Sequence, residues 1–241
     1  MLLESECLSL EIINLMIQEN IYVCRVKNFL DIEKCNSYAQ NIIAWGDKDK
    51  YEVNKSVSKI GSTIFDYAFN KDVIDYFSKV EENNKNINSI FVNQPPSQLV
   101  FDNISSIWPY GCQVETFYGQ SAYYGVIRIF DNGGTAPPHQ DMTVWDIKGC
   151  PEVQSISKQF SVNVYMRSTD NGGNLIVYDR QILEEPEYQS TFFKYLNIGF
   201  QEAHQELVKM NTKFVQLKPC IGDLIIFNSQ NFIKNILSFK P

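Results

Sequence analysis

The sequence predicts an α+β fold, mainly β, in which helices over residues 1–111 pack on a β-rich core over residues 112–241. Two patterns predict this division. In the first part, apolar residues recur at steps of three and four, which is the spacing of amphipathic helices. In the second part, short apolar and aromatic runs alternate with clusters of Gly, Pro, Asn and Asp, as in a β-sandwich or barrel. Because no internal repeat and no linker separates the parts, we expect a single domain over residues 1–241.

The first expected helix begins after Ser9. Apolar residues recur at three- and four-residue steps from there to Ile21, and Glu11 places an acidic side chain in the first turn. A short β-type run over residues 21–26 follows this helix.

Two further helices are expected before the β-rich part. Asp31 is placed to cap a helix that continues to about Ala44, because its carboxylate can accept hydrogen bonds from the first free N–H groups. Another helix is expected over about 64–80. Residues 81–88 are polar and rich in Asn, which predicts a loop or a frayed helix end.

The β-rich part divides into short strands. We expect them over residues 114–118, 123–130, 160–166, 174–178, 212–217 and 224–228. Turn signals lie at 131–134 and 170–173, both Asp-Asn-Gly-Gly, and at 219–222, Pro-Cys-Ile-Gly. A helix over about 188–200 interrupts the strands.

Charge and cysteine usage narrow the class of protein. The formal net charge of −7 argues against binding to nucleic acid or to an anionic membrane surface, so we expect a small-molecule substrate as partner. The chain has no apolar run of about 18 residues and no basic segment followed by an apolar stretch, so neither a membrane span nor a secretory signal is expected. The six cysteines are scattered without a C-x-x-C pair, as expected of reduced thiols in a cytoplasmic protein.

The segment from Arg128 to Asp141 carries the pattern that indicates chemistry. His139 and Asp141 are separated by one residue just after an expected strand, and side chains two apart on an extended chain point to the same side. Imidazole and carboxylate together suit a divalent first-row metal. One more histidine would complete the 2-His-1-carboxylate triad of non-haem iron oxygenases. On its own, an H-x-D pattern also occurs in ordinary turns with a solvated aspartate.

Four segments resemble the iron(II)/2-oxoglutarate-dependent dioxygenase superfamily and occur in the order of that family. Residues 20–35 look like the start of many such enzymes, and Ala-Pro-Pro-His-Gln-Asp at 136–141 resembles the first metal-binding loop. Residues 160–166 and 170–178 are similar to the central strand pair joined by a Gly-Gly turn. Residues 217–229 resemble the Pro-x-x-Gly-Asp turn and the strand that precede the second metal histidine.

The resemblance implies a double-stranded β-helix (jelly-roll) core with the N-terminal helices packed on it, and Fe(II) and 2-oxoglutarate as cofactors. His139 and Asp141 would be the first two metal ligands, and Arg128, Asn163 and Tyr165 are candidates for binding the co-substrate. From the residues alone, a role in carboxylate binding and an ordinary surface position at a strand end are equally compatible with Arg128. A packing role is favoured for Asn163 and Tyr165.

Within the superfamily, the chain looks most like small-molecule oxygenases, particularly those that hydroxylate or chlorinate free amino acids. In the halogenating members, Gly or Ala replaces the carboxylate ligand and leaves a position for chloride. Because Asp141 is present, the resemblance implies hydroxylation. In the family's reaction, 2-oxoglutarate and oxygen give succinate and carbon dioxide while the substrate is oxidised, and the protein supplies positioning and excludes water.

The family pattern is incomplete in this chain. The sequence has two histidines, His139 and His204, and Ile233 occupies the position at which the second metal histidine is expected. The family's 2-oxoglutarate-anchoring arginine lies further on still, and no arginine follows Arg180. We therefore expect an incomplete metal triad and an incomplete last strand of the jelly roll.

Three interpretations are compatible with this departure. The chain is a copy of an active enzyme that is truncated or frameshifted near residue 232, or it is a degenerate, non-catalytic jelly-roll protein, or His204 serves as a substitute ligand. The segment around His204 is expected to be a surface loop or helix end, which disfavours the third interpretation. A His–Asp pair by itself would bind metal weakly, because a third ligand and its supporting contacts normally fix the geometry.

Overall fold

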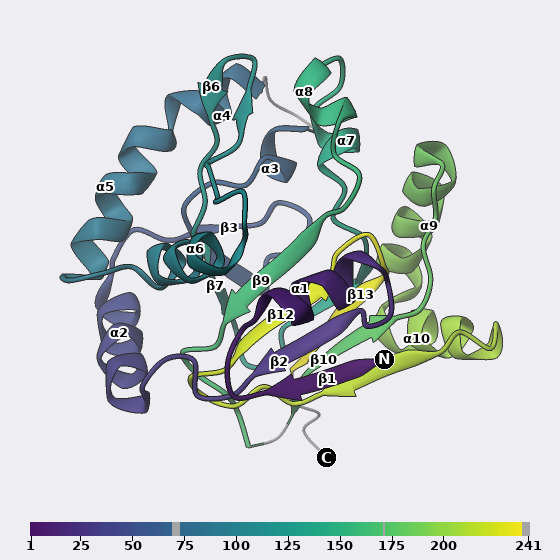
Figure 1. Cartoon of the computed structure of the whole chain (residues 1–241). Coiled ribbons are helices and arrows are strands. Elements are labelled where there is room, and N and C mark those ends of the chain that lie inside the picture. Colours follow the sequence, from purple (N-terminus) through teal and green to yellow (C-terminus); the bar gives the residue numbers. More distant parts are fainter. Residues whose placement is uncertain (69–72, 171, 238–241) are drawn as a thin grey trace.

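Two four-stranded sheets lie face to face in the computed structural model, with helices on their outer sides (Figure 1). The structure describes residues 1–68, 73–170 and 172–237. Its mixed helix and sheet content confirms the α+β class expected from the sequence.

The first sheet combines strands from both ends of the chain. Its order is β1 (Leu2–Ser5), β2 (Val23–Val26), β12 (Leu224–Asn228) and β9 (Phe160–Val164). β1 is parallel to β2, whereas β12 is antiparallel to both β2 and β9. Within the described ranges, β9 pairs with a strand on one side alone, so it forms an edge of this sheet.

The second sheet is antiparallel throughout. Its order is β11 (Phe214–Leu217), β10 (Gly172–Tyr178), β13 (Ile233–Leu237) and β8 (Thr135–His139). β13 lies between β10 and β8, and its pairing with each of them contains a register shift.

An apolar layer holds the two sheets together. Alternate side chains of both sheets point into it, as the two-residue period of a strand requires, and the buried members are Val23, Leu175, Val177, Leu217, Ile225, Phe227 and Ile233. Each fully buried side chain of this size contributes about 1.5–3 kcal/mol of hydrophobic free energy. This layer, called the inter-sheet core below, therefore accounts for much of the stability of the β-rich part.

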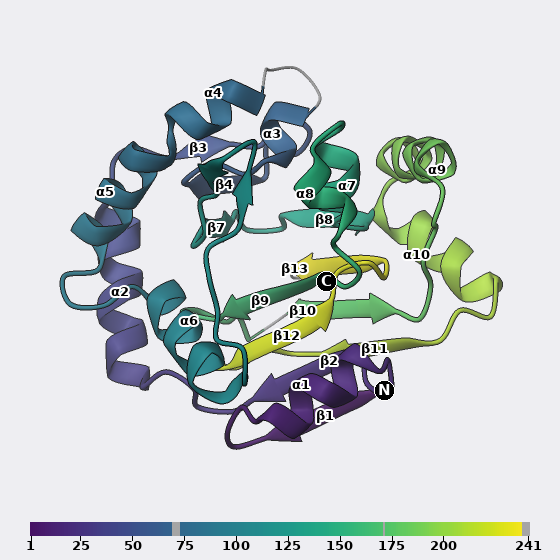
Figure 2. The same ribbon diagram turned by 45° about the horizontal axis from the view of Figure 1, so that its top comes forward.

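Helices cover the opposite faces of the two sheets (Figure 2). α1 (Leu10–Ile17) packs on the first sheet, where Cys24, Val26, Leu224 and Ile226 face it. α9 (Glu185–Ile198) and α10 (Phe200–Lys209) pack on the second sheet through Ile176 and Tyr178. The order of layers is thus helix, sheet, sheet, helices.

The rest of the chain forms a helical flank with its own apolar core. It contains α2 (Ile32–Ala44), α3 (Phe65–Ala68), α4 (Val73–Ser78), α5 (Val80–Ile90), α6 (Pro96–Ile107), α7 (Thr143–Asp146) and α8 (Pro151–Gln154). A three-stranded sheet of β3 (Asp49–Lys50), β4 (Val57–Ile60) and β7 (Ile127–Phe130) and a hairpin of β5 (Thr116–Phe117) and β6 (Gln120–Ser121) complete it. No helix in the described ranges is long and apolar enough to span a membrane.

The prediction of a loop or a frayed helix end over residues 81–88 was wrong. These residues belong to α5, whose buried side is formed by Asn83, Ile87 and Ile90. The exposed side is stabilised by an ion pair between Glu81 and Lys85, one turn apart and 2.7 Å from oxygen to nitrogen. The apolar residues on this helix are too few for a recognisable periodicity, and tertiary contacts decide its conformation.

Other boundaries differ in smaller ways. β12 matches the expected strand, and Asp31 caps α2 by accepting hydrogen bonds from the N–H groups of Glu33 and Lys34. The expected helix over 64–80 corresponds to α3 and α4, and its residues 69–72 lie outside the described residues, as does residue 171 in the expected turn over 170–173.

The turn before β12 connects the C-terminal strands to the N-terminal segment. Gly222 has a φ angle of +88°, and a Cβ added there would lie 2.3 Å from the carbonyl oxygen of Leu30. The Leu30 N–H donates to the Gly222 carbonyl oxygen at 2.9 Å. The nearly buried carboxylate of Asp223 accepts from Arg25 Nε and from the Cys220 N–H, each at 2.7 Å. The turn therefore holds β12 beside β2.

We expect Gly222→Ala to lower the free energy of unfolding by roughly 2–4 kcal/mol, because the new methyl group meets a backbone oxygen in a conformation that L side chains disfavour. Urea denaturation measures the change. Gly46→Ala is the matched control, since no atom lies within 4 Å of its added Cβ. Equal stability of the two variants would contradict this account of the turn.

Candidate metal centre

His139 lies at the end of β8 with one ring nitrogen fixed by the backbone. Its Nδ1 is 2.8 Å from the carbonyl oxygen of Pro137. Because a carbonyl oxygen can only accept, Nδ1 carries the proton, which leaves the lone pair of Nε2 free. Metal-binding histidines are commonly oriented by a hydrogen bond of this kind. The ring is therefore held in a tautomer that suits metal ligation through Nε2.

Asp141 lies beside His139 on the same side of the chain. The distance from His139 Nε2 to Asp141 Oδ1 is 3.8 Å. Ser161 on β9 donates through Oγ to Asp141 Oδ2 at 3.3 Å, and the Asp141 N–H donates to the Ser229 carbonyl oxygen at 2.9 Å. About 38% of the Asp141 side chain and 24% of the His139 side chain are exposed, so both are within reach of solvent.

Ile233 lies opposite His139 on the adjacent strand. In the antiparallel pairing of β13 with β8, Ile233 is the register partner of His139. Its side chain is 3% exposed and belongs to the inter-sheet core. An isoleucine side chain has no donor atom, so this position contributes packing and no coordination.

The side chains that the structure describes do not complete a facial triad. Among the described residues, no group of three or more His, Cys, Asp and Glu side chains could hold a metal ion. His139 and Asp141 provide two of the three protein donors that a 2-His-1-carboxylate centre uses. The pairing of β13 with β8 places Ile233 opposite His139, and the incomplete triad stays a prediction.

Gln140, between the two candidate ligands, fixes the loop from its other side. Its side chain is buried and donates through Nε2 to the carbonyl oxygens of Ile182 and Gln230, at 3.2 and 2.5 Å. Its Oε1 accepts from the Ile182 N–H at 3.0 Å, and its backbone oxygen accepts from the Tyr188 hydroxyl at 3.0 Å. Gln140 was not among the residues predicted from the sequence. The one sequence pattern that indicates its orientation is the alternation of side chains, which turns the middle residue of H-x-D away from the two candidate ligands.

Arg128 of β7 lies within the electrostatic influence of the candidate ligands. Its Nε donates to the Tyr51 hydroxyl at 3.0 Å, and its side chain is accessible to solvent. Desolvation by the surrounding protein acts to lower the pKa of the Arg128 guanidinium. Tyr51 and the negative charge of Asp141 act in the other direction, and the net effect is a raised pKa. The neighbouring Ile127 and Ile129 pack against the helical flank, so Arg128 points the other way.

Asn163 of β9 and Tyr165, which directly follows β9, lie on the same face as Ser161. The intervening Val162 and Val164 pack towards α1 on the opposite face. Burial raises the pKa of the Tyr165 hydroxyl, and the nearby charge of Arg128 acts in the other direction. The structure therefore brings Arg128, Tyr165 and the H-x-D pair to one region between the sheets and the flank. Tyr165 also packs against the inter-sheet core.

Asp146, at the end of α7, adds a second carboxyl group near Asp141. Burial raises its pKa to about 7, and the negative charges of Asp141 and Glu185 act in the same direction. A carboxyl group with this pKa exchanges its proton near neutral pH. Asp146 was not predicted as a site residue, because the sequence around it does not predict that its carboxyl group is buried.

His204 lies away from this site. The expected surface loop or helix end at this position is the interior of α10, and the residue lies on the outer side of the second sheet, where the Tyr178 hydroxyl is 2.7 Å from its Nδ1. Ile233 and the inter-sheet core lie on the inner side of that sheet. His204 is thus a packed residue of α10, half-buried rather than exposed, and is not in a position to complete the His139–Asp141 pair.

A family model described as carrier-protein-independent halogenase WelO5 matches residues 10–239, which is nearly the whole chain. The chain belongs to this family. The WelO5 family lies within the iron(II)/2-oxoglutarate-dependent dioxygenase superfamily, which confirms the resemblance carried by the four segments. No curated protein sequence matches the chain.

Two solved structures share the fold at low sequence identity. One is an N-substituted L-amino acid dioxygenase from Burkholderia ambifaria AMMD in complex with alpha-KG, with 12% identity, a TM-score of 0.55, and coverage of 95% of this chain and 82% of that one. The other is an N-substituted L-amino acid dioxygenase from the same organism, with 11% identity, a TM-score of 0.57, and coverage of 96% and 84%. At this identity the similarity establishes the fold.

The raised pKa of Asp146 predicts a pH-dependent stability. Because the folded state holds this proton more tightly than the unfolded chain, the stabilisation is present at low pH and is lost as the pH rises through about 7. We expect Asp146→Asn, in metal-free buffer, to gain stability relative to the wild type by about 2 kcal/mol between pH 5 and pH 8. Urea unfolding at both pH values measures this, with the exposed Asp75→Asn as control. A constant difference between Asp146→Asn and the wild type would refute the assignment.

Proposed function

We propose that this chain is an oxygenase of the iron(II)/2-oxoglutarate type that hydroxylates a small molecule such as a free amino acid. The observation that carries the proposal is the His139–Asp141 pair, which a WelO5-family chain presents at the end of β8 with a free Nε2 and a solvent-accessible carboxylate. The described residues supply two of the three ligands that a facial triad uses.

The architecture supports the finer fold assignment that accompanies this function. The two four-stranded sheets with their inter-sheet core support a double-stranded β-helix, with β8, β13, β10 and β11 as one wall. In this proposal the H-x-D loop lies at the rim of the jelly roll, between its two walls. The whole chain acts as a single domain.

The presence of Asp141 favours hydroxylation over halogenation. Its carboxylate occupies the position that halogenating relatives are expected to leave to chloride. The hydrogen bond from Ser161 and the backbone contact to Ser229 hold this carboxylate beside His139. While the Asp141 carboxylate holds this position, a halide cannot occupy it.

Arg128, Asn163 and Tyr165 are proposed to receive the carboxylate groups of the co-substrate. A guanidinium binds a carboxylate through two parallel hydrogen bonds, and Arg128 is accessible and lies near Asp141. Tyr165 contributes a hydroxyl donor near Arg128, and Asn163 an amide on the same face of β9.

A small acidic or zwitterionic substrate suits this region. The similarity in fold to an N-substituted L-amino acid dioxygenase supports the substrate class. We also propose a cytoplasmic location, because all six cysteines are free thiols.

A second candidate function is a non-catalytic binding protein of the same family. Ile233 favours it, since a buried isoleucine faces His139 where a ligand is needed. On this alternative, the region around His139 and Asp141 binds a small molecule without oxidising it.

An anaerobic iron(II) titration followed by measurement of succinate formed from 2-oxoglutarate distinguishes the two candidates. The oxygenase proposal predicts weak but saturable iron binding, and succinate formation at saturating iron. Asp141→Asn should weaken the iron binding at least tenfold and abolish succinate formation. Asp131→Asn, which removes an exposed carboxylate paired with Lys50, should retain both. If the wild type neither binds iron nor forms succinate, the oxygenase proposal is contradicted and the non-catalytic binding function is supported.

A further inference from the structure

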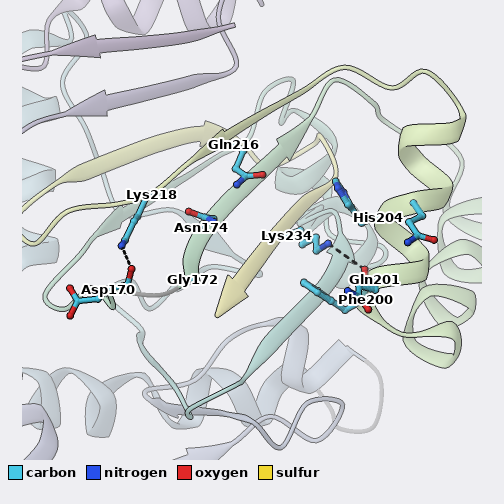
Figure 3. Close-up of a pocket in the computed structure, with 10 residues that line it drawn as sticks. Asp170, Gly172, Asn174, Phe200, Gln201, His204, Gln216, Lys218 and Lys234 are labelled. Atoms are coloured by element: carbon cyan, nitrogen blue, oxygen red, sulfur yellow. Dashed lines mark hydrogen bonds between the residues drawn. The ribbon is translucent and has the colours of Figure 1, made fainter. Parts of the chain in front are cut away.

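The second sheet carries a cavity on its outer side, beside α10 (Figure 3). α9 and α10 cover one end of this face, and the other end is hollowed to a volume of about 620 Å³. Strands β10, β11 and β13 form its floor, and the first turns of α10 form one side. None of the residues of the candidate metal centre lines it.

Lys234 places a cationic group at the floor of the cavity. It follows Ile233 on β13, so that the two side chains point to opposite faces of the sheet. The residue is 1% exposed, and its Nζ donates to the carbonyl oxygen of Phe200 at 3.3 Å and lies 3.6 Å from the centre of the Phe200 ring. Among the described residues, no carboxylate lies within 4.0 Å of its Nζ.

A buried ammonium group without a carboxylate partner is costly, because it loses hydration and gains little in exchange. The Lys234 ammonium has three N–H donors, and the Phe200 carbonyl oxygen and ring face do not occupy all of them. Burial lowers the pKa of Lys234 to about 8, so the group is still largely charged at neutral pH. An anion entering the cavity would supply the missing charge.

The other lining groups are mostly neutral or positive. Asn174 and Gln216 of the floor and Gln201 of α10 present amide groups, which can donate to an anion (Figure 3). At the rim, Lys218 donates through Nζ to the backbone oxygen of Asp170 at 2.6 Å. Asp170 provides the carboxylate among the lining residues, and it lies on the side of the cavity away from Lys234.

We propose that this cavity is a binding site for a small organic monocarboxylate, whose carboxylate group pairs with Lys234 while its apolar part lies against Phe200. One buried ammonium balances one negative charge, which favours a monoanion over a phosphate dianion. The ring of Phe200 forms an apolar wall beside that ammonium. The site is independent of the proposed oxygenase function, because it lies on the other face of the sheet.

Benzoate is a suitable probe, with benzamide as its uncharged analogue. Isothermal titration calorimetry of the full chain at pH 7 should give a dissociation constant for benzoate at least tenfold lower than that for benzamide. Lys234→Met should weaken benzoate binding at least tenfold. Lys85→Met, which removes an exposed lysine paired with Glu81 on α5, should leave it unchanged. Asp141→Asn should also leave it unchanged, which separates this site from the metal centre.

A second measurement keeps the proposal testable if Lys234→Met does not fold. Benzoate affinity of the wild type should fall at least fivefold between pH 7 and pH 9.5, as Lys234 loses its proton. Among the described residues, the other titratable groups that line this space are Asp170, His204 and Lys218, and Tyr178 contacts His204 beside it. The pH dependence should persist in Lys218→Met. Equal binding of benzoate and benzamide, or benzoate binding that is independent of pH and of Lys234, would overturn the proposal.

Discussion

The antiparallel pairing of β8 with β13 determines what this protein can do at its candidate metal centre. Side chains of register partners lie about 5 Å apart on the same face of a sheet, so the partner of His139 is the nearest side chain on the adjacent strand. That partner is Ile233. The isoleucine joins the inter-sheet core and stabilises the contact between the two sheets, but it brings no donor atom to the metal position.

The same pairing is supported from several sides. Gln140 connects the H-x-D loop to Ile182 and Gln230, which flank α9 and β13. The turn at Gly222 and Asp223 holds β12 against β2, and β12 in turn pairs with β9, which carries Ser161. The loop with His139 and Asp141 is therefore held rigidly even though its ligand set is incomplete. In the proposed metal centre, these contacts hold the loop in place and Ile233 faces His139 from the adjacent strand.

The sequence predicted those parts of the fold in which local pattern and tertiary environment agree. The run over 224–228 is apolar and bounded by a turn, and it forms β12 as expected. The roles of the H-x-D pair and of Ile233 stay predictions from motif order, and the register of β8 with β13 places His139 and Ile233 opposite each other. Arg128 and Tyr165 were recognised as candidates, but the proximity of Arg128 to Asp141 and to Tyr165 is a property of the folded chain.

The remaining features depend on contacts between distant segments. β8 contains Pro137 and Pro138, which disfavour a strand prediction, and pairing with β13 establishes it. α5 owes its helix to three buried side chains among polar ones, and Gln140 owes its role to residues more than 40 positions away. Burial of Lys234 and Asp146 follows from neighbouring elements as well. No window of sequence contains these partners.

Cobalt(II) titration of Ile233→His, followed by the visible absorption of the bound ion, tests the central claim most directly. If Ile233 occupies the third ligand position, this substitution should tighten cobalt binding at least tenfold over the wild type. The gain should vanish when His139→Ala is added, and Ile233→Leu should bind as the wild type does. Equal cobalt affinity of Ile233→His and the wild type, in folded proteins, would contradict the account.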